Sequence, residues 1–301
     1  MHITKPHYSD EEAIAFLADC DKQFDLRIAK AVTYIQQSGV RFICLSGPSC
    51  AGKTTTALKI TRELEQQGIH THVISLDNFF FNMDYLIRMS EQKGTGLDMD
   101  SVDAIDLSTF EKCLAELVDQ NQTQLPIFDF YTHSRSGYSD FKCSPKDMII
   151  LEGIQAIYPE ITSLVKPFGM ISIFVCPDQA IRVGEQVFEP NIFRFYRRIV
   201  RDSQYRGASP DRTLEIWRGV RDNEDAHIFP YREGCDIMID STMAYDLHLL
   251  TPYLRMLMPK VDEQSRYYLR ALDILNRTAA IDPIPAKYLQ EDSLYREFIQ
   301  F

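Results

Sequence analysis

Familiar metal-binding and disulfide patterns are missing from this sequence. Its seven cysteines are scattered and none forms a CxxC pair, so neither a zinc site nor a disulfide framework is indicated. No apolar run approaches the roughly 18–20 residues that span a bilayer, and residues 1–10 lack the apolar stretch of a signal peptide. We therefore expect reduced thiols in a cytoplasmic protein that makes no membrane contact.

Positive charge is also scarce. Lysine and arginine number 32 against 43 acidic residues, which gives a formal net charge of −11. Broad binding to nucleic acid requires a basic face, so we expect a small-molecule substrate and no nucleic-acid partner. Hydrophobic residues at 45% are enough for a sizeable core. The oligomeric state stays open, with a homo-oligomer among the alternatives.

Short apolar runs alternate with helical patterns along the chain. The strand-like runs occupy 41–46, 72–76, 148–151, 171–176 and 235–239, and helical patterns occupy 10–38, 51–67 and 101–120. This alternation predicts an α/β fold with a parallel sheet between helices. Alternating aromatics and turn residues at 125–144 predict an inserted β-hairpin. No Pro/Gly/Ser-rich linker divides the chain, so we expect one domain over 1–301, with an N-terminal helix in 1–39 and a helical tail in 261–301 that starts with a helix at 263–277.

A glycine-rich segment follows the first strand-like run and precedes a helical pattern. It consists of Gly47, Pro48, Ser49, Cys50, Ala51, Gly52, Lys53 and Thr54, followed by Thr55. It matches the P-loop motif G-x-x-x-x-G-K-[ST] at every fixed position, and its context is also right. Loop amides and the helix N-terminus would bind phosphates, Lys53 would contact the β- and γ-phosphates, and Thr54 would ligate Mg²⁺. We predict a nucleoside triphosphate site here rather than a chance strand-to-helix turn.

Two carboxylates come directly after strand-like runs, Asp77 after 73–76 and Glu152 after 148–151. Ligands of an open parallel sheet bind beyond the carboxyl ends of its strands, so this pair could hold Mg²⁺ and accept a proton from an attacking hydroxyl. Each acid alone could instead be a helix N-cap or a surface turn residue. The motifs of GTPases and of motor or AAA-type ATPases are absent from the sequence, which favours a small-molecule kinase.

Two further segments have unusual composition. Residues 128–135 gather aromatic rings, His133 and Arg135, a set that can stack on a flat base and bond its edge; an aromatic hairpin packed on the sheet is the alternative. Residues 191–206 hold five arginines against one acid, Asp202. At helical spacing, Arg194, Arg198 and Arg201 share a face that could contact a transferring phosphate. The alternative is a solvent-exposed helix face, but such a face normally carries both positive and negative residues.

These segments together resemble the uridine kinase and phosphoribulokinase group of P-loop kinases. Within it, the sequence is most similar to bacterial uridine kinase-like proteins that often carry threonyl-tRNA-synthetase-like N-terminal domains. The resemblance runs from about residue 10 to the end and rests on several motifs in the same order. They are GPSCAGKTT (47–55), SLDNFFFN (75–82), DMDSVDAID (98–106), FDFYTHSRSGYS (128–139), MIILEGIQAIYPEI (148–161), the segment 197–247 and SLYREFI (293–299).

The resemblance implies transfer of the γ-phosphate of ATP or GTP, with Mg²⁺, to the 5′-hydroxyl of a nucleoside, uridine or cytidine. It implies that Asp77 is the general base and that Asp77 and Thr54 lie next to the metal. It also implies that Glu152 is a Mg²⁺-associated carboxylate. A lid at 185–230 would bring in Arg198 and Arg201, which match arginines that contact phosphates.

The resemblance also assigns an acceptor site. Asp100 matches an acid that holds ribose hydroxyls, Phe130 and His133 match residues of the base pocket, and Arg206 matches an arginine near the sugar and phosphate. Phe128 stands where pyrimidine-specific members commonly have a base-bonding tyrosine. Loss of that hydroxyl weakens base discrimination, although His133 favours a pyrimidine.

Two alternatives remain. The acceptor could be another small molecule, such as a phosphosugar or a vitamin precursor, for which Arg135 and Arg182 are the candidate extra cations. The chain could also be a catalytically silent nucleotide sensor, which the intact Asp77, Glu152 and lid arginines argue against.

Overall fold

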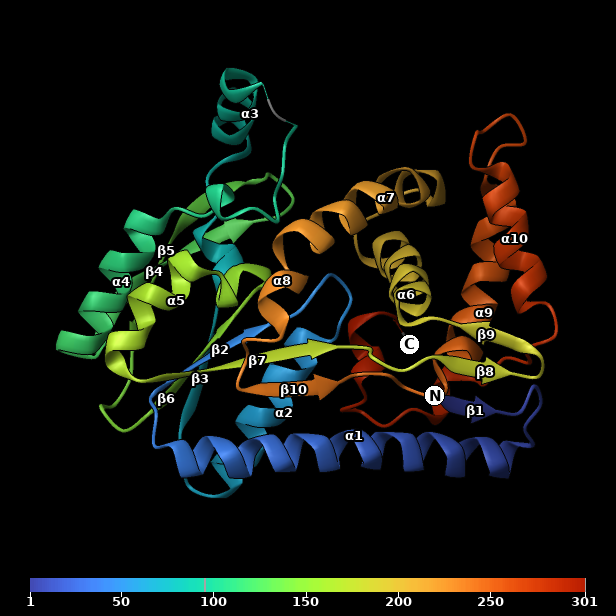
Figure 1. Ribbon diagram of the computed structural model, residues 1–301, viewed down its shortest axis with the longest axis horizontal. Coiled ribbons are helices and arrows are strands. Elements are labelled where there is room, and N and C mark those ends of the chain that lie inside the picture. The colour runs from blue at the N-terminus through green and yellow to red at the C-terminus, as the bar shows by residue number, and fades with distance from the viewer. Residues whose placement is uncertain (95, 301) are drawn as a thin grey trace.

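The main sheet has five parallel strands in the order β10-β7-β2-β6-β3 in a computed structural model that describes residues 1–94 and 96–300 (Figure 1). The predicted parallel sheet between helices is confirmed. The five strands are β2 (Phe42–Ser46), β3 (Thr71–Ser75), β6 (Met148–Glu152), β7 (Met170–Cys176) and β10 (Ile237–Asp240). Each lies within two residues of a strand-like run in the sequence.

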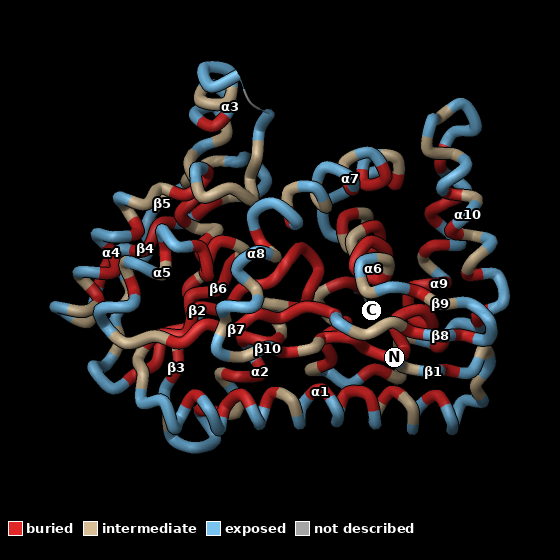
Figure 2. The backbone as a smooth tube through the Cα atoms, in the orientation of Figure 1, coloured by how far each residue is buried: buried red, intermediate tan, exposed pale blue. Residues whose placement is uncertain are grey.

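Side chains of the central strand β2 alternate between two cores, one on each face of the sheet. Ile43 and Leu45 belong to the larger core, which α1 (Asp10–Ser38), α2 (Lys53–Gln66), α6 (Pro190–Tyr205) and α9 (Asp246–Leu257) complete. Phe42 and Cys44 face the other core, which includes α4 (Leu107–Gln120) and α5 (Pro159–Val165). The strands are therefore buried on both faces, as parallel strands require; Figure 2 shows this buried centre.

The long helix α1 begins and ends where the sequence predicts. Ser9 caps its first turn and shares a capping box with Glu12, and Gly39 ends it with a left-handed φ of 64°. The remaining helices are α3 (Met83–Lys93), α7 (Pro210–His227), α8 (Phe229–Arg232) and α10 (Tyr268–Thr278).

Two smaller sheets complete the fold. β4 (Gln122–Asp129) and β5 (Ser134–Lys142) form the predicted antiparallel hairpin. β1 (His2–Thr4), β8 (Ile181–Val183) and β9 (Gln186–Phe188) form a three-stranded sheet that the sequence did not predict, because each strand has only three residues.

The tail differs from the prediction in two respects. Its helix starts at Tyr268 rather than at residue 263, because Asp262 and Ser265 form side-chain capped turns before it. The expected second helix is a 3₁₀ turn at Leu294–Glu297. No helix within the described residues is long and apolar enough to cross a membrane.

Candidate active site

The glycine-rich loop joins the end of β2 to the start of α2, as predicted. Cys50 and Gly52 adopt left-handed φ values of 58° and 91°, so the backbone curls around the N-terminus of α2. The first N–H groups of a helix have no intrahelical partner and carry the positive end of its dipole. The loop therefore has the geometry of an anion-binding site. The Lys53 ammonium lies over this loop, 3.4 Å from the Pro48 carbonyl oxygen.

Three arginines of α6 donate hydrogen bonds to the loop. The Arg194 guanidinium donates to the Ser49 carbonyl at 3.1 Å, and Arg197 donates to the Cys50 carbonyl at 3.3 Å. Arg198 donates to the Ser49 hydroxyl at 2.9 Å. These guanidinium groups thus occupy two loop carbonyls and one loop hydroxyl, and they leave the loop N–H groups without a competing side-chain acceptor from α6.

Two of these arginines are buried in ion pairs. Arg194 bonds both carboxylate oxygens of Glu224, at 2.7 and 2.8 Å, and Arg197 does the same with Asp246. Both pairs are almost fully buried. The expectation that Arg194 faces a transferring phosphate beside Arg198 and Arg201 is wrong, because Glu224 neutralises its charge.

The remaining arginines share one acid. Arg198, Arg201 and Arg206 all form ion pairs with Asp202, at 3.2, 2.7 and 3.7 Å. Arg198 and Arg201 are half-buried, and Arg206 is exposed. One carboxylate for three guanidinium groups leaves a local excess of positive charge beside the P-loop, which suits phosphate.

Asp77 and Glu152 lie at the carboxyl ends of β3 and β6, next to Lys53. Neither caps a helix: the turn at 76–79 is capped by Ser75, and the turn at 154–157 starts after Gly153. A Cβ on Gly153 would lie 2.8 Å from the Leu76 Cβ, so this glycine lets the two strand ends approach closely.

Burial raises the pKa of both carboxyl groups. The pKa of Asp77 rises despite the opposing charges of Lys53, Arg206 and Arg201. The pKa of Glu152 rises to about 7, because burial and the Asp77 charge outweigh Lys53. In the protein alone, the nearby positive charges therefore do not offset the cost of burying either carboxylate.

The donor set suits Mg²⁺, which binds through one or two carboxylates together with waters and substrate phosphates. Thr54, Asp77 and Glu152 offer a hydroxyl and two carboxylates. Burial raises the pKa of both carboxyl groups, and a bound cation would oppose that shift. No group of three or more His, Cys, Asp or Glu residues forms a protein-only metal cage among the described residues.

The segment after Asp77 links the P-loop side to the acceptor side. Phe81 donates its N–H to Ala104, Asp106 donates to Phe79, and the Asn78 side chain accepts from the Phe128 N–H. The predicted acceptor segments, 98–106 and the hairpin, are thereby joined to the end of β3.

Asp100 lies within this arrangement, partly buried. The Tyr158 hydroxyl donates to its carbonyl at 2.9 Å, and its own N–H donates to Asp98. Burial raises the pKa of Asp100 to about 6, with Arg198 and Lys53 opposing. The structure thus brings Asp100 close to the charged groups of the P-loop.

The hairpin presents its aromatic residues unequally. The Phe128 ring is only 6% exposed and packs edge-on against Phe80 and Phe130. Phe130 is 54% exposed, and His133 is exposed at the turn with a φ of 52°. The His133 carbonyl accepts a hydrogen bond from the Met83 N–H, which anchors the turn to α3. The imidazole and the Phe130 ring are therefore available to a ligand.

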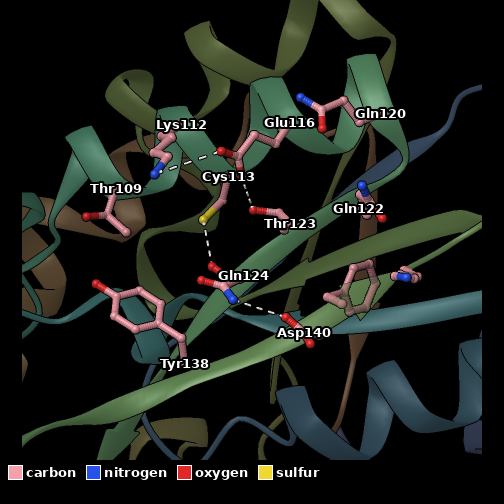
Figure 3. A pocket seen from close by; sticks show the side chains of 12 residues that line it. Thr109, Lys112, Cys113, Glu116, Gln120, Gln122, Thr123, Gln124, Tyr138 and Asp140 are labelled. Atoms are coloured by element: carbon pink, nitrogen blue, oxygen red, sulfur yellow. Dashed lines mark hydrogen bonds and ion pairs between the residues drawn. The ribbon is translucent and has the colours of Figure 1, made fainter.

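A hollow of about 550 Å³ lies between this hairpin and α4 (Figure 3). Its polar side chains bond one another: Thr123 donates to Glu116, and Gln124 donates to Asp140. None of the predicted site residues lines this hollow.

Sequence reasoning missed several groups that position the site. They are Glu224 and Asp246, which hold the arginines, and the tail residues Leu294 and Glu297, which contact the P-loop. The tail lies more than 240 residues after the P-loop in the chain, so no local spacing could reveal the contact.

Comparison with known proteins identifies the family. The family model for the phosphoribulokinase / uridine kinase family matches residues 42–248. This chain belongs to that family. It is accordingly a phosphotransferase that acts on an alcohol acceptor.

Curated relatives of this family are similar over most of the chain. A uridine kinase of Lactobacillus johnsonii is 29% identical and covers 73% of this chain and 96% of its own. A uridine kinase of Borrelia duttonii is 28% identical, and the match covers 76% of this chain and 100% of the Borrelia protein. Among solved structures, phosphoribulokinase from Rhodobacter spheroides is 17% identical, with a TM-score of 0.46, and covers 67% of this chain and 70% of its own. The assignment rests on the sequence match.

Proposed function

We propose that this chain transfers the γ-phosphate of ATP or GTP to the 5′-hydroxyl of a nucleoside, uridine or cytidine. The observation that carries the proposal is the position of Asp77. Its half-buried carboxylate lies beside the P-loop lysine and is joined through the backbone to the acceptor segments. The uridine kinases among the relatives support the nucleoside as acceptor.

On the donor side, the loop amides and Lys53 bind the β- and γ-phosphates. Thr54, Asp77 and Glu152 would hold Mg²⁺, which neutralises charge on the phosphate oxygens when bound. Arg198 and Arg201 stabilise the negative charge that spreads over the transferring group. A lid movement of residues 185–230 stays a prediction. Phe193, Ile199 and Val200 anchor α6 in the core.

On the acceptor side, Asp77 accepts the proton of the attacking hydroxyl. Burial raises its pKa, which makes it a stronger base than an exposed aspartate. Asp100 accepts hydrogen bonds from the ribose hydroxyls, and Arg206 lies near the sugar and phosphate. The base stacks against Phe130, and His133 bonds its edge.

A phosphorylated acceptor receives less support. Such a substrate requires an additional cation at the acceptor site, and Arg135 already pairs with Asp106 at 3.2 Å and contacts Tyr138. Arg182 lies on β8 in the small sheet, at the opposite end of the molecule from the hairpin (Figure 1).

The test is an ADP-release screen with Mg²⁺-ATP over nucleosides and phosphosugars. We expect turnover with uridine and cytidine, and none with phosphosugars. Turnover with a phosphosugar alone would refute the nucleoside assignment, and no turnover with any acceptor, despite nucleotide binding, would favour a nucleotide sensor.

A further inference from the structure

The tail segment 292–300 packs against the P-loop helix. The Leu294, Tyr295 and Phe298 side chains are fully buried. Leu294 fills the space beside Gly52, where a Cβ would lie 2.7 Å from the leucine Cδ1. Asp292 forms ion pairs with Lys59 and Arg62 of α2, at 3.3 and 2.8 Å. The tail is thus part of the wall of the donor site.

One tail side chain reaches the phosphate-binding amides. The Glu297 carboxylate accepts from the Thr55 N–H at 3.4 Å and from the Thr55 hydroxyl at 3.2 Å. Thr55 is the third residue of α2, so its N–H is the last of the first-turn donors without an intrahelical partner. The next N–H, of Thr56, already donates to Gly52 at 3.0 Å. Glu297 therefore takes one of the donors that a phosphate would use.

A carboxylate and a phosphate cannot share this position. Both are anions that seek the same N–H and the same helix dipole, and like charges at contact distance repel. Glu297 also lies close enough to Glu152 to contribute to its raised pKa. The negative charge of Glu297 thus acts on Glu152 as well as on Thr55.

We propose that Glu297 is an internal competitor of the donor nucleotide: its carboxylate occupies Thr55 in the empty site and must leave when the phosphates bind. This inference rests on the proposed nucleotide binding at the P-loop. The competitor lowers nucleotide affinity, since part of the binding free energy goes into displacing it.

The side chain moves while the tail backbone stays. The Tyr295 hydroxyl donates to Asp246, and the Arg197 guanidinium lies over the rings of Tyr295 and Phe298, 5.6 and 5.0 Å from their centroids. The Tyr205 hydroxyl donates to the Arg296 and Ile299 carbonyls, both at 3.1 Å. These contacts fix the backbone on both sides of Glu297, so rotation about its own side-chain bonds is the smallest movement that frees Thr55.

The experiment measures ADP binding by calorimetry for the full chain, Glu297→Gln and Glu291→Gln, with Mg²⁺ and with a chelator. Glutamine keeps the size of the side chain and removes its charge. Glu291 is an exposed acid in the same tail and serves as the matched control. Thermal unfolding without nucleotide verifies that each variant is folded.

We expect Glu297→Gln to bind ADP roughly tenfold more tightly than the parent, with and without Mg²⁺, because one charge-assisted hydrogen bond no longer has to be broken. Glu291→Gln should bind ADP like the parent. Unchanged or weaker ADP binding by Glu297→Gln would overturn the inference. If ADP binding weakens only when Mg²⁺ is present, Glu297 is a neighbour of the metal instead. If the parent binds no ADP at all, the nucleotide site itself is refuted.

Discussion

The donor half and the acceptor half of the site are held in different ways. The P-loop is fixed by buried guanidinium groups behind it and by a buried tail beside it. The acceptor segments are joined to the same strand ends by backbone hydrogen bonds, and the Phe130 and His133 side chains are exposed. Phosphate binding needs amides in one arrangement, whereas acceptor choice depends on a few side chains on surface segments. The comparison suggests a rigid donor site and an adjustable acceptor site.

The largest expected effect comes from breaking the rigid half. Among the described residues, Arg194→Met leaves the buried Glu224 carboxylate with Arg221 as its remaining ion-pair partner. Removal of one member of a buried pair typically costs about 3–5 kcal/mol. We expect the free energy of unfolding, measured with urea, to fall by about 3 kcal/mol. Arg212→Met removes an exposed pair with Glu215 and should cost under about 1 kcal/mol. Equal losses in the two variants would mean that burial does not distinguish the pairs.

The chemical step comes next in size. Asp77→Asn removes the proposed base while keeping its shape, so we expect kcat to fall roughly a hundredfold or more and ADP binding to persist. Rapid-quench measurement of phosphoryl transfer together with calorimetry separates the two effects. Near-normal turnover would eliminate Asp77 as the base.

Glu152 gives the donor half a dependence on pH. Its folded pKa of about 7 lies above the ordinary value of 4.5, so between these values the folded protein binds the proton more tightly than the unfolded chain does. The stability from the protonated group is complete below pH 4.5 and is lost as the pH rises through 7. We expect the stability advantage of Glu152→Gln over the parent, measured by urea unfolding without Mg²⁺, to grow by about 2 kcal/mol between pH 5 and pH 8. An advantage that stays constant over this range would contradict the raised pKa.

The smallest effect should appear in the adjustable half. Phe128→Tyr adds a hydroxyl to the ring that packs edge-on against Phe130, the proposed base-stacking residue. We expect the ratio of kcat/KM for uridine over a purine nucleoside to rise a few-fold, since one new hydrogen bond contributes about 1 kcal/mol. Phe141→Tyr, on the next strand and away from the loop, is the control. A ratio that is unchanged in Phe128→Tyr would mean that this ring edge does not contact the base.

Local pattern predicts most of the fold and the donor motif. The helix at 10–38, the five strands and the strand-to-helix position of the glycine-rich loop depend on periodicity, capping and spacing within short windows, and all are confirmed. Nucleotide binding by the loop stays a prediction. The roles assigned to Asp100, Phe130, His133 and Arg206 stay predictions.

Pairs that form across the chain could not be predicted. The arginines of α6 gave a strong sequence signal, but only the folded structure separates Arg194, which pairs with the buried Glu224, from Arg198, which shares Asp202 with two other arginines. The helix at 268–278 was placed too early because acidic and polar residues at 262–265 favour turns as readily as a helix start. Partner choice depends on packing, which single-sequence periodicity does not contain.

The small sheet has a consequence for the order of events during synthesis. Strand β1, residues 2–4, has its partner at residues 181–183. A growing chain contains β1 long before β8 exists, so the first strand has no partner while β2, β3, β6 and β7 of the main sheet are synthesised. Such distant pairing is slow to form and leaves a strand edge open to other chains. Three residues offer few unpaired backbone groups, and so short an edge strand is a poor template for pairing with another chain.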